Sequence, residues 1–596
     1  MMGDIVEEEK HEIENEKDAF EYQVEGFKKF SECILWEHMR RFYALQGIDA
    51  WSKGIVPSFI TCNSFIANTY AKVIIGYIED LLRNGDFEVK ESIYIIELGA
   101  GSGKFSFLLL KRLLELCDLN FGVDNVPFRI KYIMTDFCDA PFSFWQSHFS
   151  LRRFLSSGIL DFAKFDACSD NELVLENSKE VIGVNSLRNP PIVIANYLFD
   201  TLPADAYSMK DGIIHEGYVS VFSKQKESDP YDPEILNRFK PVYKWIPCDI
   251  NNNSTVQQDS IIKQILGWYQ KNLGNNASMM IPVASLSCLE RIKNMCSRKR
   301  IMVISGDKGV SSTIGLQQSS CEPHIAVHGS FSLMVNFHAI GLWFDALGGF
   351  ALHCPLEDAS LKVSVFVSHD TASVERTTQS WNCFGEPDAS RVAAFRRLNV
   401  LYHEAVHAFG PDQFFHLQNG DGEMSFLSLV ALLNLSDWDA DMVFKYREKF
   451  LDNLSSCNVR QLSDVRRGLE RSWENHFMLE MDKDLAFELG RFFYSIREFK
   501  RALVFYNKST EVAGRHFITE HNIGLCHASI GNKVKALEFF ERALELNPEY
   551  LKAQERRDMI KQEFMALSNQ ETISRQISKV KVSIDPELLL RGNFKR

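Results

Sequence analysis

The chain has 596 residues, of which 45% are hydrophobic and 24% are charged, and its 79 acidic and 66 basic residues give a formal net charge of −13. This composition is typical of a globular protein with more than one domain, and its acidic balance excludes a chain-wide basic surface for nucleic acid. The 13 Cys form no C-x-x-C pair, and the acidic N-terminus has no apolar signal segment. These features predict reduced thiols and a cytoplasmic location.

The first ninety residues divide into two parts. The Glu-rich segment 1–18 predicts disorder. In 19–90 the apolar residues recur at helical spacing, as in "FKKFSECILWEHMRRFYALQG", which predicts a helical extension. The longest apolar runs of the chain reach only about half the length of a membrane-spanning helix, so no membrane contact is expected.

Strands and helices then alternate. "SIYIIELG", "FRIKYIMTDF", "PPIVIANYLFD" and "RKRIMVISGDKG" have the apolar character of buried strands, and "KFSFLLLKRLLELC" has that of a helix. This alternation predicts an α/β fold, with a Rossmann-like domain over 91–375 built on a parallel sheet. The polar stretch near 225–295 predicts an insertion in that domain.

A glycine-rich turn joins the first strand of this domain to the following helix, in "IIELGAGSGKFSFLLL". Its glycines alternate along the chain, at Gly99, Gly101 and Gly103. A dinucleotide fingerprint would need a glycine at Lys104, and a P-loop would need Ser or Thr at Phe105. The pattern Glu97-x-Gly-x-Gly-x-Gly instead resembles motif I of class I S-adenosylmethionine-dependent methyltransferases. The resemblance implies that the glycine N–H groups approach the methionine part of this cofactor and that Glu97 binds its ammonium group.

The same resemblance implies further contacts at the ends of later strands. Asp136 in "YIMTDF" would hold the ribose hydroxyls, and Asp166 with Ala167 in "LDFAKFDACSD" would hold the adenine. Asn196 and Asp200 in "PIVIANYLFDTLPADAY" would lie near the transferred methyl group as catalytic residues, with Asn196 also contacting the cofactor. The alternative is that the glycines only form a tight turn and the acids only solvate loops.

Three segments narrow the resemblance to one family. "IANYLFDTLPADAY" resembles the ANE-x-x-DALP segment of the MidA-like methyltransferases, which include arginine methyltransferases acting on a mitochondrial respiratory subunit. "VPSFITCNSFIANTYAKVI" and "HGSFSLMVNFHAIGLWFDALGG" are similar to its segments before and after, so the resemblance covers about residues 50–350. The chain departs from the family at Tyr197, where the family has a Glu that would pair with a guanidinium.

Other residues of these segments allow two interpretations each. Asp200 could orient a substrate amine or cap the following turn. Thr61 and Asn63 could line the pocket or provide the N-cap of the next helix.

The segment "LYHEAVHAFGPDQFFHL" contains His403-Glu404-x-x-His407, a pattern that can bind zinc on a helix with Glu404 as general base. Gln413 stands where the extended form of the motif would place a third His, and Gly410-Pro411 ends the helix. The alternative is an amphipathic helix with exposed His side chains, and no metal site is assigned.

The C-terminal third is predicted to be helical, with a linker over 388–480, repeats over 483–562 and a tail over 563–596. Gly490, Ala502, Leu503, Phe505 and Tyr506 recur 34 residues later as Gly524, Ala536, Leu537, Phe539 and Phe540. This period, with small residues at helix crossings, resembles the tetratricopeptide repeat. Stacked repeats present concave surfaces to peptides.

Together these features predict an S-adenosylmethionine-dependent methyltransferase whose repeats recruit a protein substrate or partner. The alternatives are a degenerate methyltransferase fold acting as an interaction scaffold, which Tyr197 favours, and a zinc hydrolase using His403, Glu404 and His407.

Overall fold

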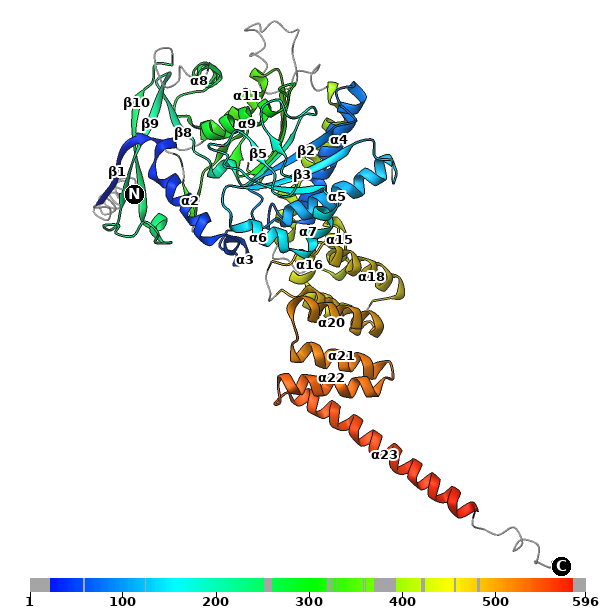
Figure 1. Cartoon of the computed structure of the whole chain (residues 1–596). Helices are drawn as coiled ribbons and strands as arrows, with labels where there is room; N and C mark the ends of the chain where they lie inside the picture. The colour runs from blue at the N-terminus through cyan, green and yellow to red at the C-terminus, as the bar shows by residue number, and fades with distance from the viewer. Residues whose placement is uncertain are drawn as a thin grey trace, which may run out of the picture. The chain divides into compact units, whose positions relative to one another are not determined.

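The computed structural model describes residues 22–582, apart from 57–58, 124, 251–259, 319–322, 324, 329, 357, 360, 369–392, 420–423, 455–456 and 480–482 (Figure 1). The segment 1–18, for which the sequence predicts disorder, lies outside these residues. The chain forms two compact units, divided between residues 423 and 424.

A seven-stranded sheet forms the centre of the first unit. Its strands, in spatial order, are β17 (Phe350–His353), β18 (Lys362–Val367), β12 (Met302–Asp307), β7 (Ile192–Asn196), β2 (Ser92–Leu98), β3 (Arg129–Asp136) and β4 (Leu160–Lys164). The five strands from β12 to β4 run parallel, whereas β18 is antiparallel to both of its neighbours. Their Val- and Ile-rich sequences suit strands that are buried on both faces.

Helices cover both faces of this sheet. One large core cluster joins sheet residues such as Ile96 and Val193 to α8 (Ser260–Asn272), α9 (Val283–Met295) and α11 (Phe337–Ala346). On the other side α4 (Ser64–Asn84) packs against α5 (Lys104–Phe121). The predicted α/β fold class is therefore confirmed.

Strand order fixes where a ligand would bind. Counted along the chain, β2, β3, β4, β7 and β12 take the spatial order 3-2-1-4-5, and the connections reverse direction between β2 and β7. In doubly wound sheets ligands bind at this switch point, outside the carboxyl ends of the strands.

A second, antiparallel sheet contains the strands β1 (Tyr22–Lys29), β9 (Ile213–Ser223), β8 (Asp205–Lys210) and β11 (Ser278–Ile281), with β10 (Phe239–Pro247) also pairing with β9. The helical extension expected over 19–90 therefore begins with a strand. The hydrogen-bond partners of β1 lie in β9, almost 200 residues away, so helical spacing in the local sequence could not reveal them. The expected insertion near 225–295 contributes β10 and β11 to this sheet, while α8 and α9 pack in the core of the main domain.

The helical stretch expected over 388–480 is divided between the units. The helix α13 (Arg396–Tyr402) packs on α4, where the buried Asp80 accepts hydrogen bonds from the main-chain N–H groups of Arg397 and Leu398 at 3.1 and 2.8 Å. The π-helix His403–Ala408 and α14 (Pro411–Asn419) follow within the first unit.

The described part of the second unit is helical. Its helices are α15 (Phe426–Leu435), α16 (Ala440–Lys445), α17 (Arg447–Leu454), α18 (Val459–Glu474), α19 (Leu485–Ser495), α20 (Phe499–Ala513), α21 (Phe517–Ser529), α22 (Lys533–Leu546) and α23 (Leu551–Val582). A Cβ atom added to Gly490 would lie 2.5 Å from the Tyr506 ring, and one added to Gly524 would lie 2.7 Å from the Phe540 ring. Glycine therefore permits both helix crossings, as the repeat pattern predicts. The expected tail from 563 is helical as far as Val582, and 583–596 lie outside the described residues.

No helix among the described residues combines the length and the apolar character that crossing a membrane requires.

Candidate functional site

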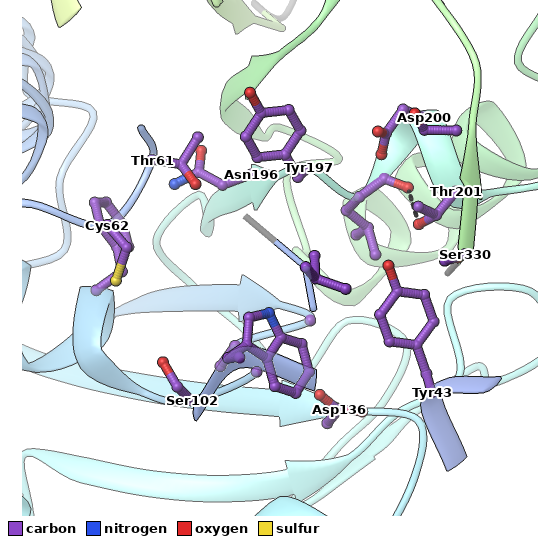
Figure 2. Close-up of a pocket in the computed structure, with 18 of the residues that line it drawn as sticks. Tyr43, Thr61, Cys62, Ser102, Asp136, Asn196, Tyr197, Asp200, Thr201 and Ser330 are labelled. Atoms are coloured by element: carbon purple, nitrogen blue, oxygen red, sulfur yellow. Dashed lines mark hydrogen bonds between the residues drawn. The ribbon is translucent and has the colours of Figure 1, made fainter. Parts of the chain in front are cut away.

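A cavity of about 290 Å³ lies at the switch point, where β2, β3 and β7 end (Figure 2). Six of the predicted site residues line it: Glu97, Gly99, Gly101, Asp136, Asn196 and Asp200. Gly103, Asp166 and Ala167 are not among its lining residues. Parallel strands bring residues from distant parts of the sequence to one edge, so acids at successive strand ends converge.

The glycine turn between β2 and α5 needs backbone angles that favour glycine. Gly99, Gly101 and Gly103 have φ values of +65°, +54° and +77°. A Cβ atom added to Gly101 would lie 2.8 Å from the Trp51 indole, and one added to Gly103 would lie 2.6 Å from Met134 Cε. Gly99 and Gly101 thus open the backbone toward the cavity, while Gly103 starts α5 and permits close packing.

Glu97 is a buried carboxyl group at the end of β2. Its Oε2 atom accepts hydrogen bonds from Ser106 Oγ and, at 2.7 Å, from the Tyr132 hydroxyl. Burial raises the pKa of Glu97 to about 7, because its effect is larger than that of the two hydrogen bonds, which lower the pKa. A cationic ligand group in the cavity would stabilise the carboxylate form.

Asp136 occupies the corresponding position at the end of β3. Its Oδ1 atom accepts a hydrogen bond from the Cys138 main-chain N–H at 3.3 Å. Burial raises the pKa of this carboxyl group above its usual value. Because Asp136 lines the cavity, its carboxyl oxygens are placed to accept hydrogen bonds from ligand hydroxyl groups at the end of the next strand along the sheet.

Asp166 is held away from the cavity by a side chain that the sequence pattern does not reveal. The Arg40 guanidinium, from α2 (Ile34–Gln46), donates to both Asp166 carboxylate oxygens at 3.1 and 2.6 Å. Burial opposes the charged form, but the Arg40 hydrogen bonds lower the pKa of Asp166 below its usual value. The main-chain oxygen of Ala167 in turn accepts a hydrogen bond from Arg291. The structure therefore does not bring Asp166 and Ala167 into the proposed cofactor contacts.

Asn196 has a fixed orientation at the end of β7. Its Oδ1 atom accepts hydrogen bonds from the buried Tyr70 hydroxyl at 2.7 Å and from the Gly306 N–H at 3.2 Å. Its Nδ2 group is buried and has no hydrogen-bond partner in the described structure. This amide is therefore a positioned donor without an acceptor, which is costly unless a ligand supplies one.

Asp200 and Asp307 form a buried carboxyl pair beside Asn196. The Asp200 main-chain N–H donates to Asp307 Oδ2 at 3.2 Å, and Asp200 Oδ1 has no partner among the described residues. Burial raises the pKa of Asp200 to about 7 and that of Asp307 well above its usual range, where the neighbouring Asp200 charge adds to the effect. Such a pair can hold a proton and accept another.

Other residues of the cavity were not predicted. Tyr43 and Trp51 stack with their ring centroids 6.1 Å apart and line the cavity beside the glycine turn. They come from the N-terminal extension, and no sequence motif marks them. Asp307 is not among the lining residues but contacts Asp200 from behind the cavity, and because it ends the parallel strand β12, the acid-at-strand-end signal that identified Asp136 could have found it.

Tyr197, which replaces the Glu of the resembling family, lines the cavity in a left-handed conformation with φ +45°. Burial raises the pKa of its hydroxyl, which favours the neutral form. Thr61 and Asn63, for which the sequence allowed two interpretations, differ in position: Thr61 lines the cavity, whereas Asn63 caps α4 by accepting a hydrogen bond from the Ile66 N–H at 3.0 Å.

His403 and His407 lie on the π-helix, with their ring centroids 4.4 Å apart, and both side chains are exposed. In the part of the chain that the structure describes, no three His, Cys, Asp or Glu side chains are grouped so that they could hold a metal ion. The zinc hydrolase interpretation therefore lacks a third ligand within these residues.

Comparison with known proteins finds similarities that include the following three. Residues 518–550 match the tetratricopeptide repeat model. One similar solved structure is an uncharacterized superfamily protein from Burkholderia thailandensis, with 14% identity over 57% of this chain and 87% of that one, and a TM-score of 0.35. Another is a superfamily member from the same organism, inferred to be a methyl transferase and bound to S-adenosyl-homocysteine. It has 14% sequence identity over 59% of this chain and 92% of that one, with a TM-score of 0.35. No curated protein matches the chain.

Proposed function

We propose that the first unit binds S-adenosylmethionine and transfers its methyl group to a protein that the repeats of the second unit recruit. The observation that carries this proposal is the glycine turn at the switch point, with buried acids at the ends of the two adjacent strands β2 and β3. A ligand at this place must tolerate close backbone approach and offer a cation to Glu97 and hydroxyl groups to Asp136.

S-adenosylmethionine has these groups. Its carboxylate suits the N–H groups of the turn at the N-terminus of α5, where the helix dipole favours negative charge. Its ammonium group suits the Glu97 oxygen that accepts no hydrogen bond from the described residues, and its ribose suits Asp136. Trp51 and Tyr43 offer aromatic surface to its apolar parts.

The bound cofactor supplies a methyl group on a sulfonium that is already a good leaving group. The chain then has to align the acceptor, exclude water and remove a proton where the acceptor carries one. The Asn196 Nδ2 group can orient an acceptor atom by donating a hydrogen bond. Asp200, with its pKa raised to about 7, is suited to take the proton near neutral pH.

The test is calorimetric titration of the full chain with S-adenosylmethionine and S-adenosylhomocysteine, beside a Gly101→Arg variant. The matched control is Gly267→Arg, because Gly267 lies in α8 with nothing within 4 Å of its added Cβ. We expect micromolar binding in the wild type and the control, and none in Gly101→Arg. A folded wild type that binds neither compound would refute the cofactor site and favour the interaction scaffold.

A further inference from the structure

One side of the main cavity carries a hydrogen-bond donor and a hydrogen-bond acceptor that both lack partners. These atoms are Asn196 Nδ2 and Asp200 Oδ1, and both are buried without a partner in the described structure. Asn196 ends β7, and Asp200 follows in the 3-10 helix Phe199–Thr201. Figure 2 shows both side chains, with Tyr197 between them, on the side of the cavity away from Asp136. The proposed reaction therefore leaves this side for the methyl acceptor.

The Asn196 amide has a fixed orientation. Its Oδ1 atom accepts hydrogen bonds from the Tyr70 hydroxyl at 2.7 Å and from the Gly306 main-chain N–H at 3.2 Å. Because a main-chain N–H can only donate, a reversed amide would place its NH2 group against another donor. The unpartnered amide atom is thus a donor, and a group that completes the site has to accept from it.

Asp200 is an acceptor that need not be paired with a cation. It shares a buried site with Asp307, and burial raises the pKa values of both carboxyl groups, so that the pair retains a proton near neutral pH. Burial also keeps the Tyr197 hydroxyl between Asn196 and Asp200 in its neutral form, because it raises the pKa of that group. Asp200 Oδ1 can accept a hydrogen bond from a neutral N–H and then take its proton.

Few nucleophilic groups of proteins match this arrangement. A guanidinium or an ammonium group offers only donors and would turn an N–H toward Asn196 Nδ2, whereas a carboxylate offers only acceptors to Asp200 Oδ1. A hydroxyl would have to use one oxygen to accept, to donate and to attack the methyl group. A primary carboxamide divides these tasks, since its oxygen accepts from Asn196, one N–H donates to Asp200, and the nitrogen faces the methyl group.

We propose that the methyl acceptor is the side-chain carboxamide of a glutamine or asparagine in the protein substrate. This inference rests on the proposed methyl transfer and names its substrate class. The amide nitrogen bonds to the methyl carbon while the carbon–sulfur bond breaks and its electron pair stays on sulfur, and one N–H proton passes to Asp200. Negative charge develops on the amide oxygen as this proton leaves, and the Asn196 donor stabilises it.

The exocyclic amine of a nucleobase also presents a donor beside an acceptor. The chain has a net charge of −13 and no chain-wide basic surface for a phosphate backbone, which favours the protein acceptor. A single-stranded DNA arm of the experiment distinguishes the two.

The experiment incubates the full chain with S-adenosylmethionine that is tritiated on the methyl group and with libraries of 12-residue peptides. Each library fixes its central residue as Gln, Asn, Arg, Lys or Ser and randomises the other positions among residues other than these five. Acid hydrolysis of the products identifies the acceptor, because an N-methyl carboxamide releases volatile methylamine, whereas methylarginine and methyl-lysine remain as amino acids. Calorimetric titration with S-adenosylhomocysteine measures the cofactor site separately.

The test variant is Asn196→Asp. It retains an oxygen for the Tyr70 and Gly306 hydrogen bonds but replaces the free donor by an acceptor. The matched control is Asn120→Asp in α5, where the exposed side chain donates to the Leu116 carbonyl and does not line the cavity. Circular dichroism of both variants checks their folding.

We expect the wild type and the control to label the Gln or the Asn library above the others, with release of methylamine, and the more strongly labelled of the two assigns the side-chain length. Asn196→Asp should lower this labelling about a hundredfold, as expected for the loss of a donor to a developing oxyanion. The ratio of carboxamide to Lys labelling should fall as well, and this ratio does not depend on cofactor affinity.

A wild type that binds S-adenosylhomocysteine but preferentially labels Arg, Lys, Ser or DNA, or labels nothing, would overturn the carboxamide assignment and leave the cofactor site standing. Equal losses of carboxamide labelling in Asn196→Asp and Asn120→Asp would also overturn it. A folded wild type that does not bind the cofactor would overturn the proposed function and this inference together.

Discussion

Replacing Glu97 by glutamine tests the electrostatics of the main cavity. The side-chain carbonyl oxygen of the introduced glutamine can accept the hydrogen bonds that Glu97 Oε2 accepts from Ser106 and Tyr132, so the packing and hydrogen bonding of the site are retained. The substitution Glu97→Gln removes the titratable carboxyl group and replaces its second oxygen by an amide NH2 group, which does not titrate. Any change in the pH dependence of stability therefore reports on the ionisation of Glu97.

The size and sign of the expected change in the free energy of unfolding follow from the raised pKa of Glu97. Burial moves the pKa of Glu97 from 4.5 in the unfolded chain to about 7 in the folded protein. Between these values the folded state holds more protons than the unfolded state, so the free energy of unfolding falls as pH rises through this window. A neutral glutamine side chain does not carry this penalty. The variant should gain stability relative to the wild type by about 2.5 kcal/mol between pH 5 and pH 8.

The assay is urea unfolding of both proteins at pH 5 and pH 8, followed by tryptophan fluorescence. The second unit is identical in the two proteins, so its contribution cancels in the difference. A wild-type-to-variant difference that is the same at both pH values would refute the reasoning. Above pH 7 the variant should also bind the cofactor more weakly, because the carboxylate that would pair with the ammonium group is absent.

Three further predictions concern other contacts. Gly524→Ala should lower the free energy of unfolding by about 1–3 kcal/mol, measured by circular dichroism during denaturation, because the added methyl group overlaps the Phe540 ring. Tyr70→Phe should lower the free energy of unfolding, measured in urea, by about 1 kcal/mol, because the Asn196 Oδ1 atom loses one of the two hydrogen bonds that it accepts. Asp136→Asn should raise stability at neutral pH, since burial disfavours the charged carboxylate, but should weaken S-adenosylhomocysteine binding in calorimetry.

Each of these has an outcome that contradicts it. Gly267→Ala, a helical glycine with open space around it, should be neutral or stabilising, and a loss equal to that of Gly524→Ala would argue against the packing explanation. A Tyr70→Phe variant as stable as the wild type would mean that the amide finds another donor. An Asp136→Asn variant with unchanged cofactor affinity would remove Asp136 from the site.

The local sequence was sufficient to predict much of the fold and part of the cavity. Apolar runs that alternate with helical patterns identified the strands of the main sheet, because burial on both faces requires continuous apolar sequence. Glycines and acids at strand ends identified Gly99, Glu97 and Asp136, because a parallel sheet brings its carboxyl ends to one edge. A fixed period of glycines and aromatics identified the helix pairs around Gly490 and Gly524.

Tertiary structure decided which polar groups are free to meet a ligand. Asp166 and Asp136 look alike in sequence, but Arg40 from a distant helix neutralises the first and leaves the second at the cavity. Tyr70 and Asp307 orient Asn196 and Asp200 from other elements, and Trp51 covers the glycine turn from the N-terminal extension. The partner of a side chain depends on which elements the fold brings together, and this information lies in contacts between residues far apart in the sequence.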